Sequence, residues 1–216
     1  KILISHQNID VNKKLIEKKY NSEDLQNNIY YVEITPLINA IKSNHYEIVK
    51  ILLDHPNIDV NKICLQNDDE FSPLSLAIAK SQTEIVSLLL KHPNINANLR
   101  LTYNDDGIKI TRSLLSIAIN SNDFGIIQLL LNHKDININN DFAVEECPNV
   151  YYLERSILSL SIETQDNDDL INILLNHPGI DINIRDYLNK RDDSLIKRKW
   201  FFHNAIKYCN INTIEK

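Results

Sequence analysis

The sequence predicts an all-α repeat fold, a solenoid of stacked helix-turn-helix units with β-hairpin loops that project between them. Two blocks of residues recur along the chain in the same order, and one loop between them alternates as a β-hairpin does. Because a pair of short helices cannot bury its own apolar face, such units occur in stacked arrays.

The first recurring block has the features of a short helix. It opens with a residue whose hydroxyl can accept a hydrogen bond from a free amide at a helix start, namely Thr35, Ser72, Ser113 and Ser156. Pro36 and Pro73 follow at the first helical position, where a missing amide costs nothing. A small residue then recurs and would let two antiparallel helices approach closely: Ala40, Ala77, Ala118, Ser161 and, in a fifth copy at 200–206, Ala205.

The second block predicts a second helix. Ile48, Ile51 and Leu52 have helical spacing, and a histidine ends the block in each copy: His6, His55, His92, His133 and His177. A proline follows three of these histidines and cannot continue the helix. In the turn beyond, we expect Asn57 and Asn94 to adopt the left-handed conformation that glycine usually supplies there.

The loop 99–112 predicts a hairpin. Leu101 and Tyr103 alternate with polar residues before an Asp-Gly turn, and Ile108 and Ile110 alternate after it. Period-two alternation around Asp-Gly is typical of two paired strands. An armadillo- or HEAT-like helical solenoid, the other fold considered, gives no reason for a hairpin at this place.

These blocks resemble ankyrin repeats. Thr35-Pro36-Leu37 with Ala40, and its copy from Ser72, are similar to the opening Thr-Pro-Leu-His-x-Ala of that family, and Asp59-Val60-Asn61 is similar to its closing Asp-Val-Asn. The resemblance implies one ankyrin-repeat domain over 1–216, a fragment of a longer array. Partial repeats at 1–12 and 184–216 would flank full repeats at 13–61, 62–98, 99–139 and 140–183.

The resemblance implies a non-enzymatic scaffold that binds a partner protein along a concave groove and its finger loops. Carried over by position, the expected binding residues are Tyr31, Lys42, Phe71, Lys80, Arg112, Asn120, Tyr152 and Arg155. The same places also hold Ile34, Ser43, Asp69, Ala79, Ile110, Ser121, Leu153 and Glu163. Tyr, Phe and Arg are enriched in binding hot spots, although the aromatic residues could equally pack finger against finger.

Two other roles stay open at this point. The chain could be the substrate-recognition arm of a larger enzyme, or a host-interacting effector, whose catalytic domain lies outside the segment. The basic stretch 190–199 could contact nucleic acid or anionic lipid, but its acidic residues and the net charge of −6 favour a solvated loop.

Composition limits the remaining possibilities. Three widely spaced cysteines indicate a reducing compartment, so we expect an intracellular, cytoplasmic protein. No apolar run in the sequence is long enough to span a bilayer. We further expect a monomer without a cofactor, because the sequence carries no catalytic or nucleotide-binding motif.

Two patterns suggest a metal but have simpler explanations. The histidines would lie about 10 Å apart in stacked helices, whereas zinc ligands lie about 2 Å from one ion. We expect each histidine to meet free carbonyls at its helix end. The run 166–169 lacks the glycine and glutamate of a calcium loop, so a solvated turn is expected. The sequence therefore predicts no metal site.

Overall fold

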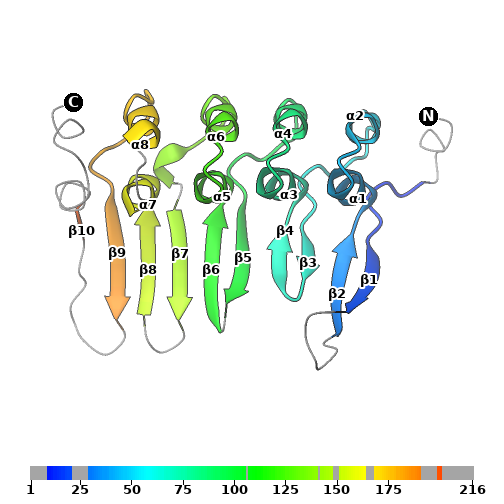
Figure 1. The fold of residues 1–216 in the computed structure, drawn as a ribbon, viewed down its shortest axis with the longest axis horizontal. Coiled ribbons are helices and arrows are strands. Elements are labelled where there is room, and N and C mark those ends of the chain that lie inside the picture. The colour runs from blue at the N-terminus through cyan, green and yellow to red at the C-terminus, as the bar shows by residue number, and fades with distance from the viewer. Residues whose placement is uncertain are drawn as a thin grey trace. The chain divides into compact units, whose positions relative to one another are not determined.

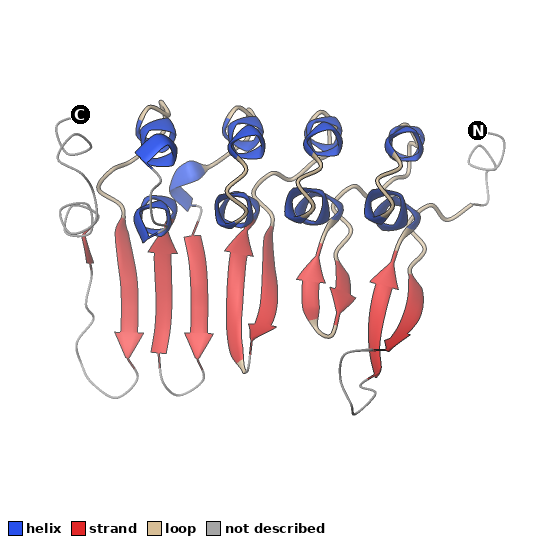
Figure 2. Cartoon of the chain, viewed as in Figure 1, coloured by secondary structure: helices blue, strands red, loops and turns tan. Residues whose placement is uncertain are grey.

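The computed structural model describes residues 9–20, 29–105, 107–140, 142–147, 151–163, 168–190 and 199–200. The chain forms two compact units, Lys1–Ala97 and Asn98–Lys216. In both units an antiparallel hairpin leads into a pair of short helices, and this module is then repeated (Figures 1 and 2). The predicted fold class is therefore confirmed, while the single domain over 1–216 stays a prediction.

The first unit contains two hairpins and two helix pairs. In chain order they are β1 (Leu15–Tyr20), β2 (Ile29–Ile34), α1 (Pro36–Lys42), α2 (Tyr46–Leu53), β3 (Cys64–Gln66), β4 (Asp69–Phe71), α3 (Pro73–Ala79) and α4 (Thr83–Leu90). The first helices α1 and α3 pack against each other, as do α2 and α4. Val32 of β2 pairs with Gln66 of β3, so the two hairpins join into one antiparallel sheet of order β1-β2-β3-β4.

The second unit repeats this plan with strands that, except for β10, are six residues long. Its elements are β5 (Arg100–Asp105), β6 (Ile108–Ser113), α5 (Leu114–Asn120), α6 (Phe124–Leu131), the 3₁₀ turn η1 (Ile138–Asn140), β7 (Phe142–Cys147), β8 (Tyr151–Ser156), α7 (Ile157–Glu163), α8 (Asp168–Leu175), β9 (Arg185–Lys190) and β10 (Lys199–Trp200). The strands form an antiparallel sheet of order β10-β9-β8-β7-β6-β5. The predicted 99–112 hairpin is β5–β6, with Asp105 opposite Ile108 and Gly107 at φ +84°.

The sequence located the helix starts correctly. Thr35 Oγ1 accepts a hydrogen bond from the amide of Ile38 at 3.2 Å, and the same bond recurs at Ser72, Ser113 and Ser156. The side chain of Ser75 also accepts from the amide of Ser72 at 2.8 Å, which completes a reciprocal capping box. Four orphan amides at the helix starts are thereby satisfied by side chains three residues away.

The expected left-handed residues were placed in the wrong turn. Among the described residues, the repeated positive φ angles occur between the two helices of a pair, at Asn44, Ser81 and Asn122, and Asn57 and Asn94 are not among them. The amides of Asn44 and His45 donate to the carbonyls of Ile41 and Ala40, the pattern that ends a helix on a left-handed residue. The turn after the second helix is closed by another group, described below.

Close packing of the helix pairs rests on the predicted small residues. Ala77, Ala118 and Ser161 have no exposed surface, and Ala40 has very little. Ser161 also donates from Oγ to the carbonyl of Leu158 at 2.8 Å, which satisfies its hydroxyl inside the core. Ala205 lies outside the described residues.

Candidate functional site

A histidine closes the turn after each second helix. Nδ1 of His55 accepts a hydrogen bond from the amide of Asn57 at 3.2 Å, and His92, His133 and His177 do the same two residues on. The expectation that these rings meet free helix carbonyls was therefore wrong for Nδ1. Accepting at Nδ1 places the proton of a neutral ring on Nε2, which fits the 3.2 Å contact from Nε2 of His177 to the carbonyl of Leu131.

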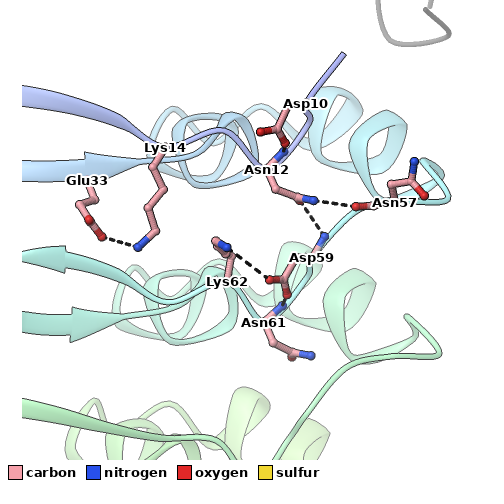
Figure 3. Close-up of polar contacts among 8 residues, drawn as sticks. All are labelled: Asp10, Asn12, Lys14, Glu33, Asn57, Asp59, Asn61 and Lys62. Carbon is pink, nitrogen blue, oxygen red and sulfur yellow. Dashed lines mark hydrogen bonds and ion pairs between the residues drawn. The ribbon is translucent and has the colours of Figure 1, made fainter. Parts of the chain in front are cut away.

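An asparagine from one repeat bonds the histidine-closed turn of the following repeat. Asn12 donates from Nδ2 to the carbonyl of Asn57 at 2.7 Å and accepts at Oδ1 from the amide of Asp59 at 2.8 Å (Figure 3). In the same unit, Asn61 bonds the carbonyl of Asn94 and the amide of Asn96 at 2.7 and 2.9 Å. One carboxamide thus pairs with a backbone donor and a backbone acceptor, as a neighbouring strand would.

The second unit has the same contacts. Asn98 bonds the carbonyl of Asp135 and the amide of Asn137, and Asn139 bonds the carbonyl of Gly179 and the amide of Asp181. We call Asn12, Asn61, Asn98 and Asn139 the ladder asparagines. The sequence analysis named Asn61 only as part of the closing ankyrin motif and did not predict a bonding network. The once-per-repeat spacing of the four asparagines was the signal that could have found it.

The sheet of the first unit has two different faces. Because side chains alternate along a strand and directly paired residues share a face, Val32, Ile34, Cys64 and Phe71 lie on one side. This packed face contacts Ile38 of α1 and Leu76 of α3, with Tyr30 and Phe71 partly buried. Burial raises the pKa of the Cys64 thiol.

The opposite, exposed face carries Ile16, Ile29, Tyr31 and Leu65. Tyr31 is 57% exposed and lies opposite Lys18 of β1. Two of the expected binding residues, Tyr31 and Phe71, therefore lie on opposite faces of one sheet and do not form a common surface. Ile34, which was expected at the same surface, is buried in the core.

Two other expected residues do come together. Lys42, at the end of α1, and Lys80, just after α3, line one open groove of about 730 Å³. The turns after the two helices and the first residues of α4 complete its lining: Ser43, Asn44, Ser81, Gln82, Thr83 and Glu84. Gln82, which is part of this lining, connects the two repeats, because its Nε2 donates to the carbonyl of Ile41 at 3.0 Å. The groove is thus a fixed polar surface that spans two repeats.

Residues 2–101 match the family model described as ankyrin repeats (3 copies). This part of the chain belongs to the ankyrin repeat family. No curated protein matches the chain. Ankyrin repeats are in general protein–protein interaction modules, and domains built from them are typically non-catalytic. The match covers the helix pairs, ladder asparagines and groove of the first unit.

The remaining expected binding residues lie in the second unit. Arg112 in β6 and Arg155 in β8 are partly buried, and Asn120 is exposed at the end of α5. Arg112 shares a sheet face with Ile110, two residues earlier. In the sheet, Tyr152 of β8 pairs with Glu146 of β7 and Asn189 of β9. The side chain of Tyr152, like those of Leu153 and Glu163, lies outside the described part.

The described residues outside these surfaces carry few signs of chemistry. Within them, no three His, Cys, Asp or Glu side chains gather as metal ligands would. Asp168 and Asp169 form the first turn of α8, where carboxylates suit the positive end of the helix dipole; the rest of the 166–169 run is outside the described part. No described helix is long and apolar enough to cross a membrane.

Proposed function

We propose that the chain is a scaffold that binds a segment of a partner protein with acidic side chains along the groove between Lys42 and Lys80. The observation that carries the proposal is the placement of two lysines, one from each of two consecutive repeats, on a single groove of about 730 Å³. Glu84 is the one acidic residue in its lining. In a chain of net charge −6, this is a local excess of positive charge.

The construction of the groove supports a binding role. Asn44 and Ser81 hold left-handed conformations at its rim, and the hydrogen bond from Gln82 to Ile41 fixes one repeat against the other. A preformed surface loses little conformational entropy when a partner binds, so more of the contact energy appears as affinity. Hydroxyl and amide groups between the lysines can bond the backbone of an extended segment.

A charge-reversal experiment tests this proposal. A partner would first be isolated by affinity capture from the source cell, and its binding then measured by calorimetry with both proteins purified. We expect the double substitution Lys42→Glu, Lys80→Glu to weaken binding about tenfold, since each exposed ion pair contributes up to about 1 kcal/mol. The helical circular dichroism signal should not change.

The matched control uses two other lysines of the same unit. Lys50 and Lys91 lie beside a separate groove of about 380 Å³ at the ends of α2 and α4. The double substitution Lys50→Glu, Lys91→Glu changes the net charge by the same amount and should leave the affinity within about twofold, because neither lysine lines the groove at Lys42 and Lys80. Equal weakening by both variants would contradict a specific role for Lys42 and Lys80.

We also propose that the protein acts as a monomer in the cytoplasm. The odd number and the wide spacing of its three cysteines support a reducing compartment. Light scattering of the purified chain tests the monomer, and fractionation of cells that express the tagged protein tests the location.

A further inference from the structure

A second surface of the first unit has the features of a strand-binding edge. Strand β1 lies at the edge of the four-stranded sheet and, within the described residues, pairs with β2 alone (Figure 1). All six of its residues pair in unbroken register, without a bulge. It also contains neither proline nor glycine. An unbroken edge strand presents backbone amides and carbonyls that another strand can bond.

The side chains next to this edge are unusually apolar for a surface. Ile16 is 69% exposed, Ile29 47% and Tyr31 57%, and all three lie on the exposed face of the sheet. Lys18 lies on the same face, between Ile16 and the hairpin end of β1. An incoming strand would therefore find an apolar position beside Ile16 and a positive charge two residues along.

Four of the six symmetric registers centred on a residue of β1 place like charges opposite each other, which disfavours a second copy of the chain as the occupant. When two identical edges pair antiparallel about a two-fold axis, one residue faces its own copy. Centring on Glu17, Lys18 or Lys19 would place like charges directly opposite, and centring on Ile16 would place Lys14 opposite Lys18, arrangements that destabilise a sheet. Lysines on an edge strand are a common defence against self-association.

We propose that β1 accepts an extended strand of a partner protein, added antiparallel to the sheet. The partner carries an acidic residue opposite Lys18 and, two residues later in its own sequence, an apolar residue opposite Ile16. Antiparallel addition is how the hairpins of this unit already join, through β2 and β3. Main-chain bonds would supply affinity, and the two facing side chains would supply specificity. This inference does not depend on the groove at Lys42 and Lys80.

The first test uses a capped synthetic peptide, Val-Thr-Glu-Thr-Val-Thr, titrated into the full chain with binding followed by amide NMR shifts. We expect a dissociation constant of about 1 mM or tighter, with the shifts concentrated on 15–20. Two further peptides carry N-methyl groups on alternate residues, in opposite phase. Strand addition predicts that one phase abolishes binding and the other preserves it, because only every second amide faces β1.

The second test changes the protein. Lys18→Glu should weaken binding of the peptide about fivefold. A peptide with lysine in place of its glutamate should restore the affinity for this variant. Ile16→Asp should weaken binding at least as much, whereas the control Ile9→Asp changes an exposed isoleucine outside the sheet. Equal binding of both methylated peptides, no binding of the parent peptide, or dimerisation of the chain through β1 would overturn the proposal.

Discussion

The substitution Asn61→Ala isolates the contribution of one ladder asparagine to the coupling between repeats. The Asn61 carboxamide bonds the carbonyl of Asn94 at 2.7 Å and the amide of Asn96 at 2.9 Å, across 33 and 35 residues of chain. Alanine removes both bonds and leaves the backbone of the following turn in place. The change therefore acts on the contact between two repeats and leaves the helices themselves unaltered.

The size of the effect follows from the exposure of the groups left behind. A net hydrogen bond contributes about 1 kcal/mol, so two bonds give about 2 kcal/mol. Both Asn94 and Asn96 are exposed, and water can replace the lost partners at their backbone groups without a burial penalty. The expected loss thus stays near about 2 kcal/mol, below the larger cost of leaving a buried group unsatisfied.

Urea unfolding followed by circular dichroism at 222 nm measures this loss. With a slope of about 2 kcal/mol per M urea, the midpoint of the first unit should fall by about 1 M. Asn94→Ala is the matched control, because its backbone accepts and donates while its side chain is exposed. If Asn61→Ala shifts the midpoint no more than Asn94→Ala, the ladder does not couple the repeats and the reasoning fails.

Three further predictions concern the core, a helix start and a thiol. Ile85→Ala should cost about 3 kcal/mol in urea unfolding and the equivalent Ile48→Ala less than about 1 kcal/mol. The reason is burial, because Ile85 is 1% exposed and Ile48 is 45% exposed. Equal costs would contradict this difference in burial. Ser113→Ala removes the 3.0 Å bond from the amide of Ser116 and should cost about 1 kcal/mol in the same assay, with Ser113→Thr as the variant that keeps the bond and the stability. Maleimide labelling of Cys64, read by mass spectrometry, should be slow in the native protein and fast in urea. Burial removes access to the thiol and raises its pKa, which lowers the reactive thiolate fraction. Rapid labelling of the native protein would show that strand β3 opens.

Much of the local structure could be predicted from the residues alone. Thr35 and Ser113 mark helix starts because a capping bond spans three residues. Asp105 and Gly107 frame a hairpin because few residues tolerate φ near +84°. The left-handed residues were misplaced because asparagines follow both helices, and the sequence does not tell that an imidazole already closes the second turn.

The candidate site depended more on tertiary structure. By position in the repeat, Tyr31 and Phe71 were expected on one surface, but the register of β2 with β3 places them on opposite faces of the sheet. A shift of one residue would reverse this assignment, and no local pattern fixes the pairing between hairpins from different repeats. Lys42 and Lys80 line one groove because α1 packs on α3.

The sequence by itself determined the repeat, the two helices in each described copy and the caps of the first helices, because these depend on spacing within about one or two helical turns. Only the tertiary structure decided which edges of the hairpins pair and which backbone groups the ladder asparagines reach. Asn12 meets Asn57 and Asp59 across 45 and 47 residues. Contacts at that separation depend on how the repeats stack, and stacking is a property of surfaces that are assembled only once each helix pair has formed.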